Sequence, residues 1–459
     1  MRESYVDCLN HKLLSLLKEE REKSDHQTLK SDEELAEKAK EIEQSIRYNI
    51  VDFRSYKELS ICQDGKRRYV REYGRESNEY IITKYIKRYL DKKYNISYPN
   101  RNSIMRNLFN EIKIIRKIKG FLIVKMDFQD YYNSISSSYV YENFIKGGEL
   151  QRIHMDLLDK FVEEVPFCYA GIPVSNALAE LIGREFDEVL VSKLHKDGLI
   201  YYKRYIDDIF MIFNNEYLIN KCIDVVNDVI REVYKRIDVL CGFKCSTRIN
   251  ANKTCYIQSC DLSGNNEKKI DFLGYQFSIS KCIGNKNNPF FKIKYGITEK
   301  KRTKYKNQIK KIVEEYKRKS NKILLKHRIR AFCSRVVYVD ARGRSEKWIN
   351  RGILANYREL RCHVKELDAE TNEFLDGVVS KVFDEMNVPK PRFIINPFPS
   401  PYRLKDAFKK NQALMLTPYP CMGYSLESLK TMCKSVGGEG ETDSYHELLR
   451  EYLDLLECK

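Results

Sequence analysis

The chain has 459 residues, of which 42% are hydrophobic and 32% charged, so it can bury a sizeable core and we expect two or three globular domains. No stretch approaches eighteen consecutive apolar residues, and the first residues lack the apolar core of a secretion signal, so we expect a cytoplasmic protein without a membrane span. The formal net charge of +17 favours a polyanionic partner, and nucleic acid is the leading class.

The first elements in chain order are a charged helix and a hairpin. Residues 31–48 begin with a capping box, in which Ser31 is answered by Glu34, and continue as a helix that we expect at the periphery. From residue 51 the sequence changes to short apolar runs broken by turn residues. There, Asp64-Gly65 predicts the turn of a β-hairpin with a basic tip.

The next segments alternate between helices and strands. Residues 100–118 are predicted to be helical, and 121–128 (FLIVKMDF) to form a buried strand. Residues 171–194 predict a loop that enters a long helix, and two apolar runs then surround the YIDD sequence. A helix at 216–236 follows, with further strands through IDFLGYQFSI. This order predicts an α+β protein in which a sheet is layered on helices.

Four of the fourteen cysteines fall close together in this region. Their spacing fits no common zinc pattern and the stretch itself predicts strands, so reduced thiols are the favoured interpretation and a metal site is the weaker alternative. The four residues are Cys241, Cys245, Cys255 and Cys260.

Positive charge is concentrated beyond residue 298. Residues 300–330 contain fourteen Lys or Arg but two acids, Glu314 and Glu315. Apolar residues recur there at i, i+3, i+4 and i+7, which predicts an amphipathic helix with a basic face. The C-terminal third is predicted to be largely helical, with a proline-rich interruption at 388–403 and a last helix capped by Ser444 and Glu447.

Asp207-Asp208 is the strongest local signal for chemistry. Two adjacent aspartates between apolar strand segments are costly at a buried hairpin unless a cation compensates them, although the same pair is common in ordinary turns. Asp127 ends an apolar strand eighty residues earlier, and neighbouring strands can bring the three carboxylates together. Nucleotidyl transfer uses such a cluster, because two Mg²⁺ ions about 4 Å apart activate a 3′-hydroxyl and stabilise the leaving pyrophosphate.

Five short motifs follow one another along the chain. They are Asp127 with the aromatic Tyr132 five residues later, GIPVS (171–175), YIDD (205–208), NANKT (250–254) and DFLGY (271–275). In this order they resemble the successive palm motifs of reverse transcriptases. The resemblance covers roughly residues 51–280 and implies a right-hand polymerase fold with fingers and palm, followed by a helical thumb-like and C-terminal region.

The resemblance implies a role for each residue of the catalytic motifs. Asp127, Asp207 and Asp208 would ligate two Mg²⁺ ions, for which Mn²⁺ is a possible substitute, with the Phe128 carbonyl as an additional ligand. Tyr132 would be the steric gate whose ring fills the space of a ribose 2′-hydroxyl, so the product would be DNA made from dNTPs.

The resemblance also implies contacts with the substrate. A basic fingers turn would grip the triphosphate, since a guanidinium can bind phosphate oxygens bidentately, whereas a solvated basic turn is the alternative. Lys253 would donate a proton to pyrophosphate or bind a phosphate, although a lone lysine is usually a surface residue. The implied substrate-binding residues are Lys66, Arg67, Arg68, Tyr132, Gly171, Pro173, Ser175 and Lys253.

Two departures from the usual pattern refine the resemblance. Group II intron and retron enzymes have Gln-Gly and Ser-Pro in the glycine-containing motif, whereas here Ala170 precedes Gly171 and Asn176 follows Ser175. This variant is more similar to the abortive-infection and other defence-associated bacterial reverse transcriptases. Some of those enzymes make DNA without a template and start on a protein hydroxyl, but thirty-two tyrosines give no means of choosing a primer.

The resemblance therefore implies an RNA-directed or template-independent DNA polymerase in antiphage defence. A mobile-element reverse transcriptase and a non-catalytic nucleic-acid-binding scaffold are the alternatives. An RNA template, the DNA product, a non-coding RNA, a neighbouring defence protein and a second copy of the chain are the partners to consider. The predicted segments are an N-terminal helical segment (1–50), fingers and palm (51–290), a basic thumb-like region (291–388) and a C-terminal extension (389–459).

Overall fold

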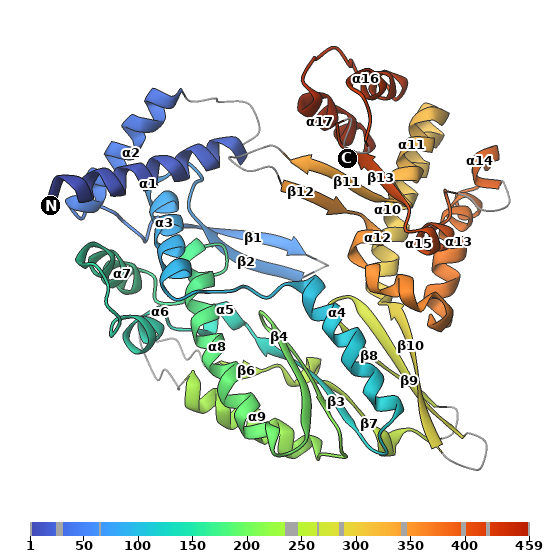
Figure 1. The fold of residues 1–459 in the computed structure, drawn as a ribbon, viewed down its shortest axis with the longest axis horizontal. Helices are drawn as coiled ribbons and strands as arrows, with labels where there is room; N and C mark the ends of the chain where they lie inside the picture. Colours follow the sequence, from blue (N-terminus) through green and yellow to red (C-terminus); the bar gives the residue numbers. More distant parts are fainter. Residues whose placement is uncertain are drawn as a thin grey trace. The chain divides into compact units, whose positions relative to one another are not determined.

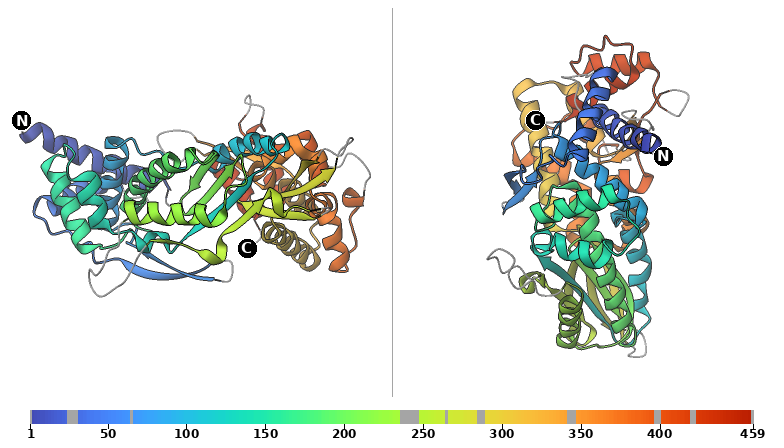
Figure 2. Two further views of the ribbon diagram at one scale, coloured as in Figure 1. Left: turned by 90° about the horizontal axis from the view of Figure 1, so that it is seen from below. Right: turned by 90° about the vertical axis from the view of Figure 1, so that its left-hand side faces the viewer.

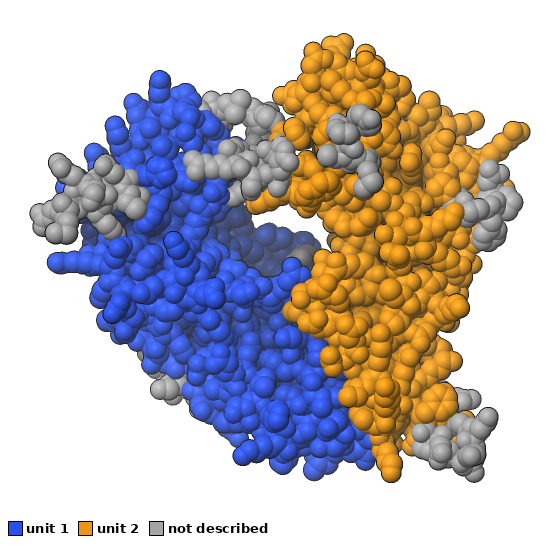
Figure 3. Space-filling view, in the orientation of Figure 1, with its two compact units in different colours: residues 1–101, 120–258 blue, residues 102–119, 259–459 orange. Residues whose placement is uncertain are grey.

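The structure is a computed structural model that describes residues 2–23, 31–63, 66–234, 247–263, 266–283, 289–340, 347–395, 401–418 and 423–457. Two compact units divide the chain: residues 1–101 with 120–258, and residues 102–119 with 259–459 (Figure 3). This division differs from the four predicted segments, which stay a prediction. Among the described residues, no helix has the length and apolar character needed to cross a membrane.

The first unit is built around an antiparallel sheet whose central strand is β3 (Leu122–Gln129) (Figure 1). β3 pairs along one edge with β5 (Asp208–Phe213), which pairs in turn with β4 (Leu199–Tyr205). Along its other edge β3 pairs with β7 (Cys255–Gln258), and its last residues pair with β6 (Arg248–Ile249). Six of the eight residues of β3 are buried, as the largely apolar sequence predicts for a strand covered on both faces.

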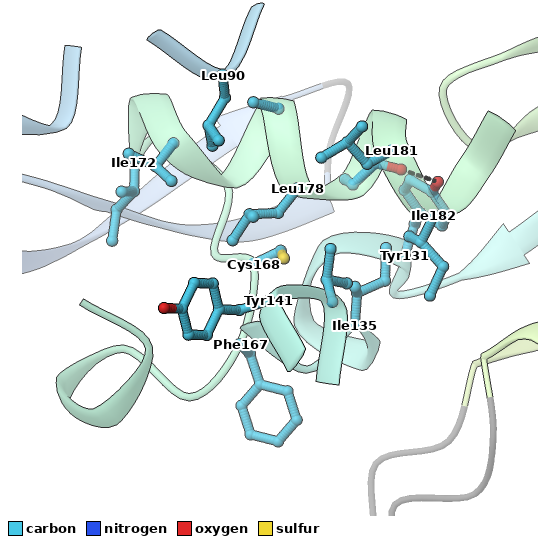
Figure 4. Packing of buried hydrophobic residues seen from close by; sticks show 14 of the residues in the cluster. Leu90, Tyr131, Ile135, Tyr141, Phe167, Cys168, Ile172, Leu178, Leu181 and Ile182 are labelled. Carbon is cyan, nitrogen blue, oxygen red and sulfur yellow. Dashed lines mark hydrogen bonds between the residues drawn. The ribbon is translucent and has the colours of Figure 1, made fainter. Parts of the chain in front are cut away.

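Helix α8 (Pro173–His195) is the main support of this sheet. It packs against α9 (Ile219–Val233), α3 (Asn78–Lys93) and strand β4 (Figures 1 and 2). Proline is well tolerated in its first turn because the backbone N–H groups there have no partner within the helix. Figure 4 shows Leu178, Leu181 and Ile182 of α8 packed among buried residues that include Tyr131, whose hydroxyl donates to the Ala179 carbonyl at 3.1 Å.

Several local predictions for the first unit are confirmed. The Ser31 hydroxyl accepts from the Glu34 N–H, and the Glu34 carboxylate accepts from the Ser31 N–H at 2.7 Å. The strands on either side of Asp64-Gly65 pair in antiparallel register, while these two turn residues lie outside the described residues. The remaining elements are α1 (Arg2–Lys23), α2 (Asp32–Arg47), β1 (Lys57–Gln63), β2 (Lys66–Glu72), α5 (Tyr131–Ser134), α6 (Ser137–Val140), η2 (Tyr141–Ile145), α7 (Arg152–Glu164) and η3 (Ala251–Lys253).

The second unit contains two three-stranded sheets and a set of helices. In the first sheet β9 (Tyr275–Ile283) lies between β8 (Glu267–Phe272) and β10 (Pro289–Ile297), and the Leu273-Gly274 turn has positive φ at both residues. The helices are α4 (Arg101–Glu111), η1 (Ile112–Arg116), η4 (Ser259–Asp261), α10 (Glu299–Lys319), α11 (Lys322–Phe332), α12 (Ile353–Asn356), η5 (Arg358–Glu366), α13 (Ala369–Glu385), α14 (Arg392–Ile395), α15 (Leu404–Lys410), α16 (Leu426–Ser435) and α17 (Tyr445–Leu456).

The prediction of a largely helical C-terminal third is confirmed, but this part of the chain also contains strands that the sequence analysis did not expect. A second sheet lies there, in which β11 (Arg335–Asp340) pairs antiparallel with β12 (Lys347–Arg351) and parallel with β13 (Ala413–Leu416). The parallel partner is more than seventy residues away, so local periodicity gives no sign of the pairing. The last helix is confirmed, with the Ser444 hydroxyl accepting from the Glu447 N–H.

Candidate active site

The centre of the candidate site is a pair of opposed carboxylates. Asp127 on β3 and Asp208 on β5 are directly opposite in the antiparallel register. Residues in such positions have Cβ atoms about 5 Å apart on the same face of the sheet. Asp207 lies in the turn between β4 and β5, where its carbonyl accepts from the Phe128 N–H at 3.0 Å. The structure therefore brings the three predicted aspartates to one end of the strand pair.

Charges of both signs act on the Asp207 carboxyl. Burial, followed by the negative charge of Asp127, raises the pKa of the Asp207 carboxyl, while the charges of Lys253 and Arg68 act in the opposite direction. Asp127 is 5% exposed, and Lys253 Nζ lies 2.6 Å from its Oδ1. Like charges opposite one another destabilise a sheet, so these carboxylates favour a bound cation.

The donor chemistry fits a hard divalent cation, because carboxylate and carbonyl oxygens are the groups that Mg²⁺ prefers. The Lys253 ammonium already serves as the positive partner of Asp127. Within the described residues, however, no group of three or more His, Cys, Asp or Glu side chains is arranged to hold a metal ion. Phe128 has its ring buried against Phe186, so it can offer a metal nothing but backbone atoms.

Tyr132 lies near enough to Asp207 to feel its charge. It follows β3 in the short helix α5, after Asp130 has turned the chain with a left-handed φ of 50°. Burial, followed by the charge of Asp207, raises the pKa of the Tyr132 hydroxyl to about 12. The predicted gate residue and the predicted metal ligand are thus close enough to interact electrostatically.

The β1–β2 hairpin brings one of the three predicted basic residues toward the site. The charge of Arg68 acts on Asp207. Arg67 precedes it on the same strand and points to the opposite face, because side chains alternate along a strand. Lys66 begins β2, and its side chain lies outside the described part of the chain.

The β1–β2 hairpin packs closely against the loop before α8 at Gly171. The φ of Gly171 is +104°, and a Cβ there would lie 2.4 Å from the Arg71 carbonyl oxygen and 2.5 Å from Val70 Cγ1. The Arg71 N–H donates to the Ala170 carbonyl at 2.9 Å, and the Arg71 guanidinium lies 3.6 Å from the centre of the Tyr169 ring. Glycine is required here because β2 passes so close to the loop.

The other two predicted substrate-binding residues of this motif, Pro173 and Ser175, lie in the first turn of α8. Pro173 begins α8 and is partly exposed, whereas Ser175 is fully buried and its hydroxyl has no hydrogen-bond partner among the described residues. Of the clustered cysteines, Cys255 and Cys260 are exposed free thiols, and Cys241 and Cys245 lie outside the described residues.

Sequence reasoning missed a buried ionic cluster behind the YIDD turn. Arg204 is 6% exposed and forms ion pairs with Glu180 and Asp187 of α8. Two signals in the sequence could have indicated this cluster. One is the arginine in the strand sequence YYKRY, and the other is Gly183 inside a long predicted helix.

Comparison with known proteins gives weak likenesses. No protein-family model matches the chain, and no curated protein matches it. Among solved structures, apo telomerase from Candida tropicalis truncated from the C-terminal domain is 14% identical, with 49% of this chain and 53% of that chain covered and a TM-score of 0.33.

Two further telomerases are similar at the same low level. Apo telomerase from Candida tropicalis gives 13% identity over 48% of this chain and 46% of that chain, with a TM-score of 0.31. Telomerase from Candida albicans in complex with a fragment of telomeric RNA gives 11% identity over 87% of this chain and 66% of that chain, with a TM-score of 0.34. The match spans about half the length of the Candida tropicalis chains, and scores this low assign neither family nor activity.

Proposed function

We propose that this chain is a DNA polymerase of the reverse transcriptase class, which adds dNTPs to a 3′-hydroxyl or, at initiation, to a protein hydroxyl. The observation that carries the proposal is the opposition of Asp127 and Asp208 across β3 and β5, with Asp207 in the adjoining turn. Antiparallel register pairs Asp127 with Asp208, which is eighty-one positions later in the sequence. An ordinary solvated turn does not require a buried carboxylate, here Asp127, on the neighbouring strand.

Asp127, Asp207 and Asp208 would hold Mg²⁺, which when bound lowers the pKa of the attacking hydroxyl and stabilises the charge on the leaving pyrophosphate. Lys253 would leave Asp127 as the cation binds, and its ammonium would then be available to pyrophosphate. Arg68 would bind phosphate oxygens of the incoming nucleotide. The ring of Tyr132 would exclude a 2′-hydroxyl, so that deoxynucleotides are preferred.

The biological role of this chain among reverse transcriptases is proposed from its sequence. The GIPVSN variant of the glycine-containing motif supports a bacterial defence enzyme over a group II intron or retron enzyme. The basic helix α10 supports a nucleic-acid partner.

One observation favours a second candidate, a nucleic-acid-binding protein without catalysis. Among the described residues, no three His, Cys, Asp or Glu side chains are arranged to hold a metal ion, and Asp127 is already paired with Lys253. This candidate keeps the basic surface and the fold but predicts that no nucleotide is incorporated under any condition.

The test is incorporation of labelled dNTPs by the full chain with Mg²⁺, with and without an RNA template and primer. We expect labelled DNA from the wild type, and at least a 100-fold loss in a variant with Asp207→Asn and Asp208→Asn. A variant with Asp156→Asn and Asp159→Asn, two exposed acids of α7, should keep wild-type activity.

The outcomes separate the candidates. Labelled DNA that stays with the protein until protease treatment supports protein priming, and DNA made only with template and primer supports a mobile-element type of enzyme. A wild type that binds nucleic acid tightly but incorporates no dNTP under any of these conditions would overturn the polymerase proposal in favour of the scaffold.

A further inference from the structure

The ionic cluster behind the YIDD turn has a geometry that ordinary packing does not require. Arg204 Nε donates to Asp187 Oδ1 at 2.8 Å, and Nη2 donates to Glu180 Oε1 at 3.1 Å. A buried guanidinium is costly unless it is paired, and both partners come from α8. The cluster therefore fixes the guanidinium between the sheet and the helix.

A third donor of the same guanidinium reaches the turn itself. Arg204 Nη1 donates to the carbonyl of Ile206 at 3.1 Å. Ile206 has a φ of +59°, a left-handed conformation that a β-branched residue adopts very rarely. The carbonyl that Arg204 holds belongs to the peptide group leading directly into Asp207.

The turn is thus held on both sides of Asp207. The preceding peptide is held by Arg204, and the Asp207 carbonyl accepts from the Phe128 N–H of β3. A strained backbone persists where its surroundings over-determine it, and strain of this kind is common at functional sites.

Helix α8 leaves space for the Arg204 guanidinium at Gly183, which has no side chain. A Cβ at Gly183 would lie between 2.5 and 2.8 Å from three atoms of the Arg204 guanidinium. Tyr202 donates to the same Asp187 Oδ1 at 2.5 Å, which fixes that carboxylate. Glycine in the middle of a helix is unfavourable, so its presence here is explained by the space that Arg204 needs.

We propose that Arg204 is a positioning residue that holds the Ile206–Asp207 peptide in the conformation required for cation binding at Asp207. Glu180 and Asp187 hold Arg204, and Gly183 gives it room. The consequences for cation binding and catalysis rest on the proposed polymerase function, whereas the effect on the turn does not.

The test compares Arg204→Gln with a matched control, Arg328→Gln. Arg328 is also 6% exposed and paired, with Glu315 and the Leu455 carbonyl, but it belongs to the second unit. The control therefore reports what the loss of a buried arginine does to the protein in general. Three quantities are measured below the melting temperature of each variant: amide hydrogen exchange in the 203–209 segment, Mn²⁺ binding by electron paramagnetic resonance, and single-nucleotide incorporation.

We expect Arg204→Gln to speed exchange in the turn at least ten-fold while leaving residues 122–126 of β3 protected. Mn²⁺ binding should weaken at least ten-fold, and kcat should fall more than the KM for dNTP rises. Arg328→Gln should lower the melting temperature without these changes. Turn exchange and Mn²⁺ affinity that match the wild type in folded Arg204→Gln would overturn the proposal.

Gly183→Ala is the second variant, and it keeps the test decisive if Arg204→Gln does not fold. Helix propensity alone predicts that alanine stabilises α8, whereas displacement of the guanidinium predicts faster turn exchange and weaker Mn²⁺ binding. A stabilised variant with unchanged exchange and Mn²⁺ affinity contradicts the positioning role. A wild type that incorporates no nucleotide overturns the polymerase proposal alone, because the exchange measurement still decides what Arg204 does.

Discussion

Lys253 and Asp127 form an ion pair across the candidate site, with Nζ 2.6 Å from Oδ1. Because the ammonium and a metal ion would compete for the same carboxylate, we predict that Lys253→Gln binds Mn²⁺ about three-fold more tightly and yet incorporates dNTP more slowly. Titration with Mn²⁺ and single-turnover kinetics measure the two effects. Lys268→Gln, which removes a lysine paired with Asp261 at 2.8 Å, is the control and should change neither. Weaker Mn²⁺ binding in Lys253→Gln would contradict the competition.

The size of the Tyr132 side chain is predicted to set the choice of sugar. Tyr132 lies close enough to Asp207 for its pKa to respond to that charge. Tyr132→Ala should lower the preference for dNTP over NTP by about ten-fold or more, because the ring no longer fills the 2′ space. Tyr132→Phe keeps the ring and should keep the preference. Incorporation assays with paired dNTP and NTP measure it, and equal preferences in both variants would rule out the gate.

Gly171 is predicted to be intolerant of any side chain. In Gly171→Ala, the new Cβ would meet the Arg71 carbonyl oxygen at 2.4 Å, at a φ of +104°. We expect the free energy of unfolding to fall by about 2 kcal/mol or more, measured by urea denaturation. Gly74→Ala is the matched control, since a Cβ at Gly74 would meet no other atom within 4 Å, and it should be nearly neutral. A neutral Gly171→Ala would mean that β2 does not pack on this loop.

Helix α10 carries cations in two different environments. Lys304 and Lys311 are exposed, seven residues and about 10.5 Å apart, with no acidic partner among the described residues. Lys306 and Lys310 are paired with Glu385. We predict that the double variant Lys304→Gln with Lys311→Gln makes nucleic-acid binding less dependent on salt. The magnitude of the slope of the logarithm of the binding constant against the logarithm of the salt concentration should fall by about 1.5.

The matched control for α10 is Lys306→Gln with Lys310→Gln, which removes the same charge from the same helix. Because the single carboxylate of Glu385 holds both ammonium groups and offsets one of their two charges, the magnitude of the slope should change less, by about 0.9 at most. Equal changes in the two double variants would show that net charge, rather than this face of α10, governs binding.

His154 is predicted to make stability depend on pH. It is 1% exposed, its Nε2 lies 2.8 Å from the Tyr85 hydroxyl, and burial lowers its pKa to about 4 from an ordinary 6.5. Between these values the unfolded chain binds a proton that the folded chain does not. Stability should therefore fall as the pH drops from 6.5 to 4, by an amount on the order of 2 kcal/mol.

Urea denaturation at several pH values, compared with His154→Gln, measures the contribution of His154. The difference between the wild type and the variant should shrink toward pH 4 and be constant above pH 7. A pH-independent difference would show that His154 has the same pKa in the folded and the unfolded chain.

The sequence by itself determined the local elements and the identity of the candidate chemical groups. The Ser31 capping box, the buried strand that ends near Asp127 and the amphipathic helix after residue 298 all follow from patterns within a few residues. The aspartates, Tyr132, Arg68 and Lys253 could be named because order and residue type are properties of the chain. Their opposition across strands could be expected but not demonstrated.

The tertiary structure alone decided which of these groups meet and what supports them. Strand register sets Asp127 against Asp208, and alternation along β2 separates Arg68 from Arg67. The pairing of β11 with β13, and the contact of Arg204 with Glu180, Asp187 and Ile206, join residues whose local sequence patterns are independent. Such contacts form because buried charges and strand edges must find partners, and where those partners lie is a property of the packed fold.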